Sequence, residues 1–138
     1  MNAVDSNILL YSVDIHEPAK LSRAQELIEK LSDEQTILPW QELCEAANGL
    51  RRWANKGRIS ASAAEGYIEL FSELYPVEMP TELQIFREAT LLFRKVKLSH
   101  WDSLLIAACA VAGVSTLYSE DSQSGEIISG VRIVNPFV

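Results

Sequence analysis

The residues best suited to chemistry are acidic side chains next to predicted strand ends and helix starts. Asp5 follows a short apolar segment at the N-terminus, and Asp121 follows the apolar segment that begins at Val114. Asp102 lies in the first turn of an apolar helix that is predicted to begin at Ser99. Ligands of open parallel sheets bind beyond the carboxyl ends of the strands. If the two strands are neighbours, all three carboxylates can face one crevice.

A group of carboxylates in one crevice predicts a bound cation. Two carboxylates about 5 Å apart repel each other by roughly 3 kcal/mol at an effective dielectric constant of 20, and a cation removes that cost. Magnesium and manganese prefer oxygen ligands, and magnesium usually keeps waters that a substrate phosphate can replace. The predicted cofactor is therefore Mg2+ or Mn2+, which would also link an acidic protein to a polyanion.

Each acid also has a purely structural interpretation. Asp102 can stabilise its own helix as part of an S-x-x-D capping box, an effect of about 0.5–1 kcal/mol. Asp5 can cap a helix that starts at Ser6, and Asp121 can be a turn residue in a polar loop. Pattern alone leaves these interpretations open.

Motifs of other enzyme classes are absent from the sequence. His16 and His100 have no metal-ligand spacing, and there is no phosphate-binding loop, dinucleotide fingerprint or serine-hydrolase elbow. A phosphotransfer site would need a late lysine, and none follows Lys97. Cys44 and Cys109 are far apart in predicted helices, so both are expected to be reduced and buried.

The charge distribution limits how the chain could contact nucleic acid. A net charge of −7 argues against coating of nucleic acid by bulk electrostatics. Two local basic clusters could still contact phosphate. They consist of Arg51, Arg52, Lys56 and Arg58, and of Arg94, Lys95 and Lys97.

The elements that must position these residues alternate along the chain. Apolar segments predict strands at 2–5, 36–38, 77–79, 114–118 and 131–134. Helices are predicted after Asp5, from Pro18, from Pro39, from Ser60, after Thr81 and from Ser99. Parallel neighbours need crossover connections, so the predicted fold class is α/β, with a central parallel sheet between two helical layers. A length of 138 residues fits a single domain.

Two helices have distinct apolar patterns. The helix after Thr81 is expected to carry Leu83, Phe86, Thr90 and Phe93 along one face. The helix that ends at Gly113 is apolar on all sides and is expected to be the buried central helix.

The longest apolar run is too short to cross a bilayer, and the N-terminus lacks the basic residues of a secretory signal. A cytoplasmic protein without membrane contact is therefore expected.

Five blocks of sequence together resemble the PIN-domain nucleases, and most closely the VapC-type toxins of type II toxin–antitoxin pairs. The blocks span nearly the whole chain, and S-H-W-D-S-L-L-I-A-A-C is the most specific of them. They are V-D-S-N-I-L-L-Y at 4–11, P-W-Q-E-L-C-E-A-A-N-G-L at 39–50, S-H-W-D-S-L-L-I-A-A-C at 99–109, L-Y-S-E-D-S-Q-S-G at 117–125 and V-R-I-V-N-P-F at 131–137.

The resemblance implies roles for particular residues. The catalytic and metal-binding acids would be Asp5, Glu45, Asp102 and Asp121, with Asn7 and Ser119 in support. Glu42 competes with Glu45, and helical periodicity slightly favours Glu42. Glu120 competes with Asp121 for the fourth position.

The resemblance also implies an activity and partners. A PIN-like fold of this type would hydrolyse phosphodiester bonds in single-stranded or loop RNA, with the metal ion activating water for attack at phosphorus. A cognate antitoxin and a homodimer are the implied protein partners. The alternative is a non-catalytic RNA-binding or scaffold module of the same fold.

Overall fold

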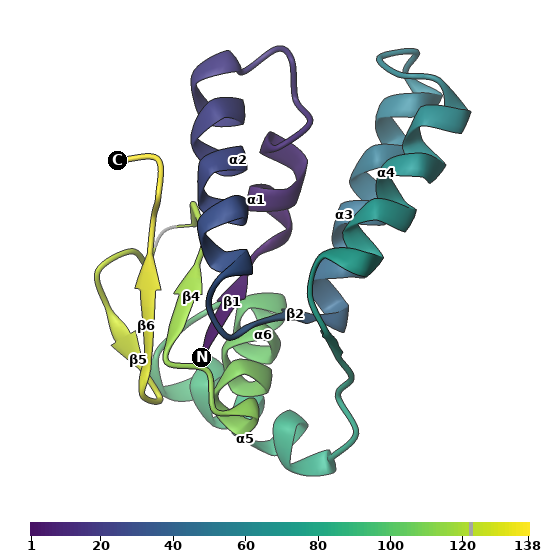
Figure 1. Cartoon of the computed structure of the whole chain (residues 1–138). Helices are drawn as coiled ribbons and strands as arrows, with labels where there is room; N and C mark the ends of the chain where they lie inside the picture. Colours follow the sequence, from purple (N-terminus) through teal and green to yellow (C-terminus); the bar gives the residue numbers. More distant parts are fainter. Residues whose placement is uncertain (122) are drawn as a thin grey trace.

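The computed structural model describes residues 1–121 and 123–138. Within these residues six strands form one sheet in the order β3-β2-β1-β4-β6-β5. The strands are β1 (Asn2–Val4), β2 (Thr36–Pro39), β3 (Val77–Glu78), β4 (Thr116–Tyr118), β5 (Ile127–Ile128) and β6 (Val131–Val134). The helices are α1 (Ser6–Tyr11), α2 (Pro18–Ser32), α3 (Trp40–Asn55), α4 (Ala61–Leu74), α5 (Leu83–Lys95) and α6 (His100–Ala112), as drawn in Figure 1.

The sheet is parallel from β3 to β6, which confirms the predicted parallel core. Ala3 of β1 is aligned with Ile37 of β2 on one side and with Leu117 of β4 on the other. Val4 is aligned with Tyr118, so β1 and β4 end side by side. The residues that follow these two strands therefore leave the sheet at the same edge.

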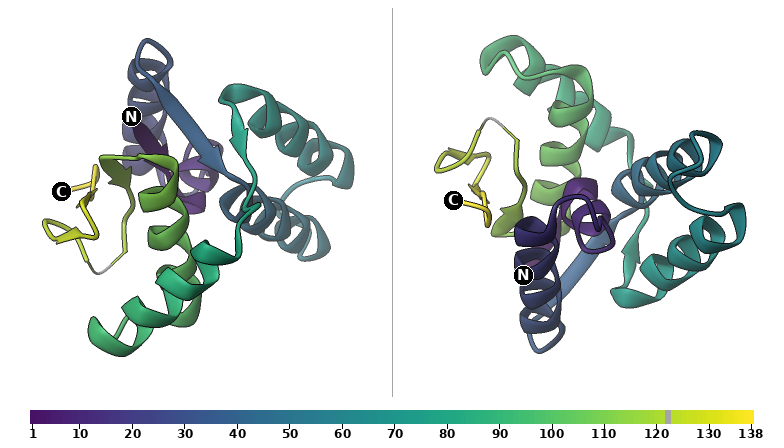
Figure 2. Two further views of the ribbon diagram at one scale, coloured as in Figure 1. Left: turned by 90° about the horizontal axis from the view of Figure 1, so that it is seen from below. Right: turned by 90° about the horizontal axis from the view of Figure 1, so that it is seen from above.

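Successive residues of the central strands face opposite helical layers. Ala3 and Leu117 pack in a core with α5 and α6, whereas Val4 and Leu38 pack in a core with α1 to α4. Figure 2 shows the α5–α6 pair on one side of the sheet and α1 and α2 on the other. This alternation, which follows from the two-residue repeat of a strand, confirms the predicted three layers.

The edge strand β5 was not predicted. It runs antiparallel to β6, with Ile128 aligned to Val131. The connecting residues Ser129 and Gly130 both have positive φ angles, 51° and 79°, as a tight hairpin turn requires. Two strand residues carry too little pattern to identify a strand, and no strand was predicted between residues 118 and 131.

The apolar face that the sequence indicates for α5 faces outward in the structure. Leu83, Phe86 and Phe93 are exposed by 63%, 56% and 53%, whereas the helix buries Ile85 and Leu92. Both sets follow helical spacing, so the sequence gives the helix two apolar stripes and only packing against α6 selects one. The helix also begins after Glu82 rather than being capped by Thr81.

Three smaller features differ from expectation or add to it. Cys109 is buried as predicted, but Cys44 is exposed on α3. Pro39 precedes the first turn of α3 instead of lying within it. In the part of the chain that the structure describes, every helix is too short or too polar to cross a membrane.

Candidate active site

Asp5 lies at the junction of β1 and α1 and is held by two neighbouring elements. Its backbone N–H donates to the carbonyl oxygen of Tyr118 at the end of β4, at 2.9 Å. Its Oδ1 accepts from the backbone N–H of Asn7 at 3.4 Å, and its Oδ2 accepts from Ser119 Oγ at 2.6 Å. The side chain is 4% exposed. Asp5 therefore caps α1, and its carboxylate is also fixed to the end of the adjacent strand.

Asp102 and Asp121 meet Asp5 at a small cavity. Asp5, Asp102, Ser119, Asp121 and Gln123 contribute its polar lining, and its volume is about 20 Å³. That volume accommodates one water molecule or one small ion. Ser119 Oγ accepts from the backbone N–H of Asp121 at 3.1 Å while it donates to Asp5, so one hydroxyl joins two of the acidic residues.

The environment of Asp121 changes the pKa of its carboxyl group. Burial raises the pKa of Asp121 to about 6, and the charges of Asp5 and Asp102 add to the effect. Asp102 itself follows the cap of α6, where its backbone N–H donates to Ser99 Oγ at 3.1 Å. Its side chain lines the cavity with the other two acids. The capping motif is present, and it leaves the Asp102 carboxylate available to the site.

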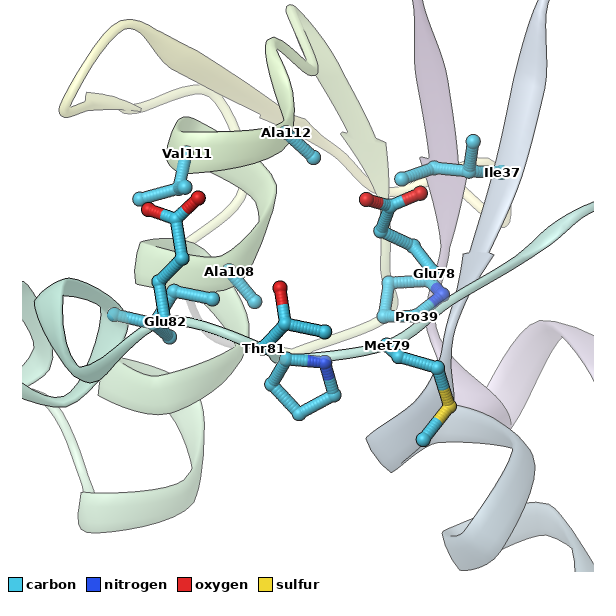
Figure 3. Close-up of a pocket in the computed structure, with 11 residues that line it drawn as sticks. Ile37, Pro39, Glu78, Met79, Thr81, Glu82, Ala108, Val111 and Ala112 are labelled. Carbon is cyan, nitrogen blue, oxygen red and sulfur yellow. The ribbon is translucent and has the colours of Figure 1, made fainter.

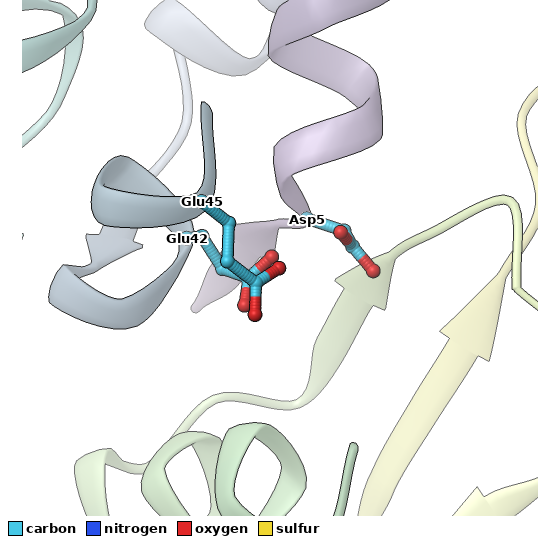
Figure 4. Close-up of side chains that lie close together, drawn as sticks. All are labelled: Asp5, Glu42 and Glu45. Atoms are coloured by element: carbon cyan, nitrogen blue, oxygen red, sulfur yellow. The ribbon is translucent and has the colours of Figure 1, made fainter. Parts of the chain in front are cut away.

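Two glutamates of α3 lie on the other side of Asp5. Asp5, Glu42 and Glu45 each have a carboxylate oxygen within 4.8 Å of the other two, and Figure 4 shows both glutamates pointing towards the start of α1. Glu45 is exposed and accepts from Gln41 Nε2 at 3.2 Å and from Ser6 Oγ at 3.3 Å. Asp5 is therefore shared by two groups of acids.

Glu42 is the more unusual of the two glutamates. It is 1% exposed, and its Oε2 accepts from the backbone N–H of Ser6 at 2.7 Å. Its Oε1 is buried without a hydrogen-bond partner among the described residues. Burial raises the pKa of Glu42 well above its usual range, and the charge of Asp5 raises it further. A buried carboxylate oxygen without a donor is costly unless something else pairs with it.

The remaining residues singled out from the sequence are Glu120, Asn7 and Ser119, and they lie beside the acidic cavity or next to the segment that carries Asp121. Glu120, the rival of Asp121, forms an ion pair with Lys20 of α2, and Asp121 lines the acidic cavity. Asn7 Oδ1 accepts from the backbone N–H of Glu120 at 3.4 Å, so the predicted supporting residue contacts the segment that carries Asp121. Ser119, the other supporting residue, contacts Asp5 directly.

The donor set fits a hard divalent cation. All the grouped side chains offer carboxylate or hydroxyl oxygens, which magnesium and manganese prefer. The unpaired Oε1 of Glu42 and the raised pKa of Asp121 both indicate negative charge that lacks compensation. Cys109 is close by, but burial, together with the charges of Glu42 and Asp5, raises the pKa of its thiol. That thiol stays protonated and is a poor metal ligand.

Sequence reasoning missed Ser6 as a member of the site. Its backbone N–H binds Glu42, and its Oγ lies 3.2 Å from Asp5 Oδ1 and 3.3 Å from Glu45 Oε2. Only the approach of α3 to α1 creates the contacts with Glu42 and Glu45, so the sequence carries no signal for those two.

A separate cavity of about 110 Å³ lies under the segment that joins β3 to α5. Glu78 and Glu82 lie on opposite sides of it, as Figure 3 shows. None of the predicted site residues lines this cavity. The acids singled out from the sequence belong instead to the edge of the sheet where β1 and β4 end.

Comparisons with known proteins connect this geometry to solved structures. No protein-family model matches the sequence, and no curated protein matches it. Several solved structures are similar in fold over most of the chain, three of them as follows. A toxin–antitoxin complex from Klebsiella pneumoniae gives a TM-score of 0.71 at 17% identity, covering 99% of this chain and 98% of the other. VapBC2 from Rickettsia felis, bound to a DNA fragment from its promoter, gives 0.69 at 12% identity, covering 96% of each chain.

The third structure is VapC20 from Mycobacterium tuberculosis, described as a toxin that cleaves the sarcin–ricin loop. It gives a TM-score of 0.61 at 18% identity and covers 88% of this chain and 91% of the other. The chain therefore has the fold of VapC-type PIN toxins, as the sequence blocks predicted. At these identities the likeness establishes the fold alone.

Proposed function

We propose that this chain is a metal-dependent endoribonuclease, the toxin of a toxin–antitoxin pair, that hydrolyses phosphodiester bonds in single-stranded or loop RNA. The observation that carries the proposal is the convergence of Asp5, Asp102 and Asp121 on a cavity the size of one ion. The fold supports it, because one protein of the same fold is described as a toxin that cleaves the sarcin–ricin loop.

Each polar residue of the site has a role in this proposal. Asp5, Asp102 and Asp121 would hold Mg2+ or Mn2+, with Glu42 or Glu45 as a further carboxylate. The ion, when bound, supplies an acidified water and charge compensation at phosphorus. Ser119 donates to Asp5 and accepts from the backbone of Asp121, so it keeps two of the ligands in place before an ion arrives.

Isosteric variants test the catalytic assignment. Purified protein is expected to cleave single-stranded RNA with magnesium or manganese, and Asp5→Asn or Asp102→Asn should abolish cleavage, because an amide cannot supply the missing negative charge. Asp33→Asn is the matched control, since Asp33 is an exposed aspartate at the end of α2. Cleavage by Asp5→Asn and Asp102→Asn at the wild-type rate would reject the proposal.

The proposal includes protein partners. The matching structures from Klebsiella pneumoniae and Rickettsia felis are of toxin–antitoxin complexes, which supports an antitoxin as partner of this chain. We further propose a homodimer and a cytoplasmic site of action, where RNA and a newly made antitoxin are both available. Co-expression with the adjacent small reading frame should yield a stable complex and should relieve growth arrest. Arrest that persists with Asp5→Asn would contradict toxicity through this site.

A further inference from the structure

Two exposed tryptophans border a cavity beside the acidic site. Trp40 opens α3 and is 43% exposed, and Trp101 lies in the first turn of α6 and is 61% exposed. Both line a single cavity of about 180 Å³ whose wall also includes Gln41, Leu104 and Leu105. Large aromatic rings that remain in contact with water next to a hollow are typical of binding surfaces.

The tryptophan cavity adjoins the acidic cavity through shared residues. Gln41 Nε2 donates to the carbonyl oxygen of Trp101 at 3.1 Å and to Glu45 Oε1 at 3.2 Å. Leu105 lines both cavities, and Asp102 directly follows Trp101 in the chain. If one group of a molecule is bound at the proposed metal ligands, the neighbouring group of that molecule would therefore lie over the tryptophan rings.

Exposed basic side chains precede Trp101 in the chain. Arg94, Lys95 and Lys97 are all exposed, and none of them joins an ion pair within the described residues. Arg51 and Arg58 of the other basic cluster are each already bound to a carboxylate. Lys97 is four residues before Trp101, so their α-carbons are at most ~14 Å apart. Lys97 is thus a cation available for phosphate close to Trp101, and Lys95 and Arg94 lie two and three residues before Lys97.

We propose that Trp40 and Trp101 form a stacking site for an unpaired base next to the scissile phosphate, with Arg94, Lys95 and Lys97 contacting flanking phosphates. This inference rests on the proposed ribonuclease activity. It restricts the substrate of that activity to RNA in which the base next to the cleaved bond is unpaired and can leave the base stack. Aromatic rings bind single strands in this way, because every base has a flat π-face. Gln41 and Glu78, two polar residues of the cavity, offer an amide and a carboxylate to base edges.

A nucleic acid fits this surface better than a second copy of the chain. The surroundings combine acids that would bind a metal ion with cations that lack partners, and a polyanion that shares the metal would satisfy both. A protein partner would have to bury these charges, which costs free energy unless each one is paired. The aromatic residues Phe86 and Phe93 of α5 line a different cavity, which shares Leu104 alone with the tryptophan cavity, so Phe86 provides a control ring outside the proposed site.

Steady-state cleavage of a single-stranded oligonucleotide tests the proposal. Trp101→Ala should raise KM on the order of 10-fold to 100-fold, the loss expected from one stacked base, while kcat changes little. Trp101→Phe should restore most of the affinity. Phe86→Ala removes a comparably exposed ring outside the proposed site and should leave KM unchanged. An equal KM increase in Trp101→Ala and Phe86→Ala would overturn the proposal.

An abasic position in the oligonucleotide identifies the group that the ring contacts. Removing the stacked base should reduce kcat/KM of the wild type by the same factor as Trp101→Ala, and the two losses should not add. Fully additive losses at every position would overturn the inference while the ribonuclease assignment stands. If light scattering shows that Trp101→Ala converts a dimer into a monomer, and if that monomer binds RNA as tightly as the wild type does, the rings would be assigned to an interface between copies instead.

Binding without cleavage separates the two proposals. In the Asp5→Asn, Trp53→Phe background, the remaining tryptophan fluorescence comes from Trp40 and Trp101. A single-stranded oligonucleotide should quench that fluorescence, and Trp101→Ala should remove most of the quenching. If the wild-type protein cleaves no RNA but this variant still shows quenching, the stacking site would be supported and only the nuclease assignment would be rejected. Absence of quenching would overturn the stacking site.

Discussion

At the scale of single residues, the site is defined by unequal environments for similar acids. Glu42 and Glu45 both approach Asp5, yet Glu42 is buried with one unpaired oxygen and Glu45 remains in solvent. The same contrast separates Asp121, which lines the acidic cavity, from Glu120, which is paired with Lys20. Residue type is therefore less informative here than the partners that each carboxylate meets.

Amide variants distinguish the two glutamates. Glu42→Gln should raise the Tm of the metal-free protein at neutral pH by a few degrees, because it removes a carboxyl group whose ionisation is opposed in the folded state by burial and by the charge of Asp5. It should also reduce RNA cleavage by at least about tenfold, a loss of roughly 1.4 kcal/mol of transition-state stabilisation. Glu45→Gln, the exposed counterpart, should change Tm little. If Glu45→Gln loses more activity than Glu42→Gln, the assignment based on sequence resemblance is the right one.

At the scale of elements, helix ends determine where the site residues lie. Ser99 caps α6 and places Asp102 in its first turn, and Gly113 ends the same helix with a φ of 82°. Asp5 caps α1 directly after β1. Two of the acids thus gain their positions from ordinary helix starts, where a carboxylate is also stabilised by the helix dipole.

A pair of glycine variants tests the importance of the α6 end. Gly113→Ala should lower the free energy of unfolding by about 1 kcal/mol, because alanine is strained at positive φ. Gly66→Ala should instead raise it by about 0.5–1 kcal/mol, since Gly66 is exposed within α4 and a Cβ there meets nothing within 4 Å. Chemical denaturation measures both changes. A destabilised Gly66→Ala or an unaffected Gly113→Ala would contradict this account.

Tyr75 joins the end of α4 to α2 and gives the helical layer a dependence on alkaline pH. Its hydroxyl donates to the carbonyl oxygen of Ile28 at 2.8 Å. Burial raises the pKa of Tyr75 from 10.0 to about 12. The folded state therefore holds the proton more tightly than the unfolded state, so this contribution to stability is complete below pH 10 and is lost as the pH rises towards 12.

Tyr75→Phe removes both the hydrogen bond and the titration. At neutral pH the variant should be less stable by about 1 kcal/mol, the usual net value of a buried hydrogen bond. The difference in Tm between wild type and variant should narrow as the pH rises above 10, where the wild type begins to lose the contribution. A difference that is constant up to pH 11 would show that the phenol does not carry this pH dependence.

At the scale of the whole molecule, sheet order brings the acids together. β1 lies between β2 and β4, so the segments after β1 and β4 share one edge, and α3, which follows β2, reaches Asp5 from the other side. The resulting concentration of negative charge opposes folding in the absence of a cation. Stability of the molecule and metal binding are therefore coupled.

Melting measurements with and without manganese test that coupling. Saturating Mn2+ should raise the wild-type Tm by several degrees, since a ligand at 100 times its Kd adds about 2.7 kcal/mol to the folded state. Asp5→Asn should remove most of this increase and Asp33→Asn should retain it. Potassium chloride at equal ionic strength controls for screening. An increase of the same size in Asp5→Asn would place the manganese effect elsewhere on the protein.

The sequence by itself determined most of the elements and the local position of two acids. Short apolar segments predicted the strands of the parallel core, the 3.6-residue apolar repeat predicted helices, and the position of Asp5 and Asp102 at helix starts was readable from capping patterns. These features depend on neighbours within a few positions. The alternation of strand and helix segments along the chain was sufficient to predict three layers.

Only the tertiary structure decided which acids share a pocket and which surfaces stay open. The burial of Glu42, the pairing of Glu120 with Lys20 and the outward face of α5 each depend on contacts between segments far apart in sequence. Local patterns carry no information about such contacts, because helical spacing describes two stripes of α5 equally well. The rings of Trp40 and Trp101 became a candidate site only when α3 and α6 were placed side by side around one cavity.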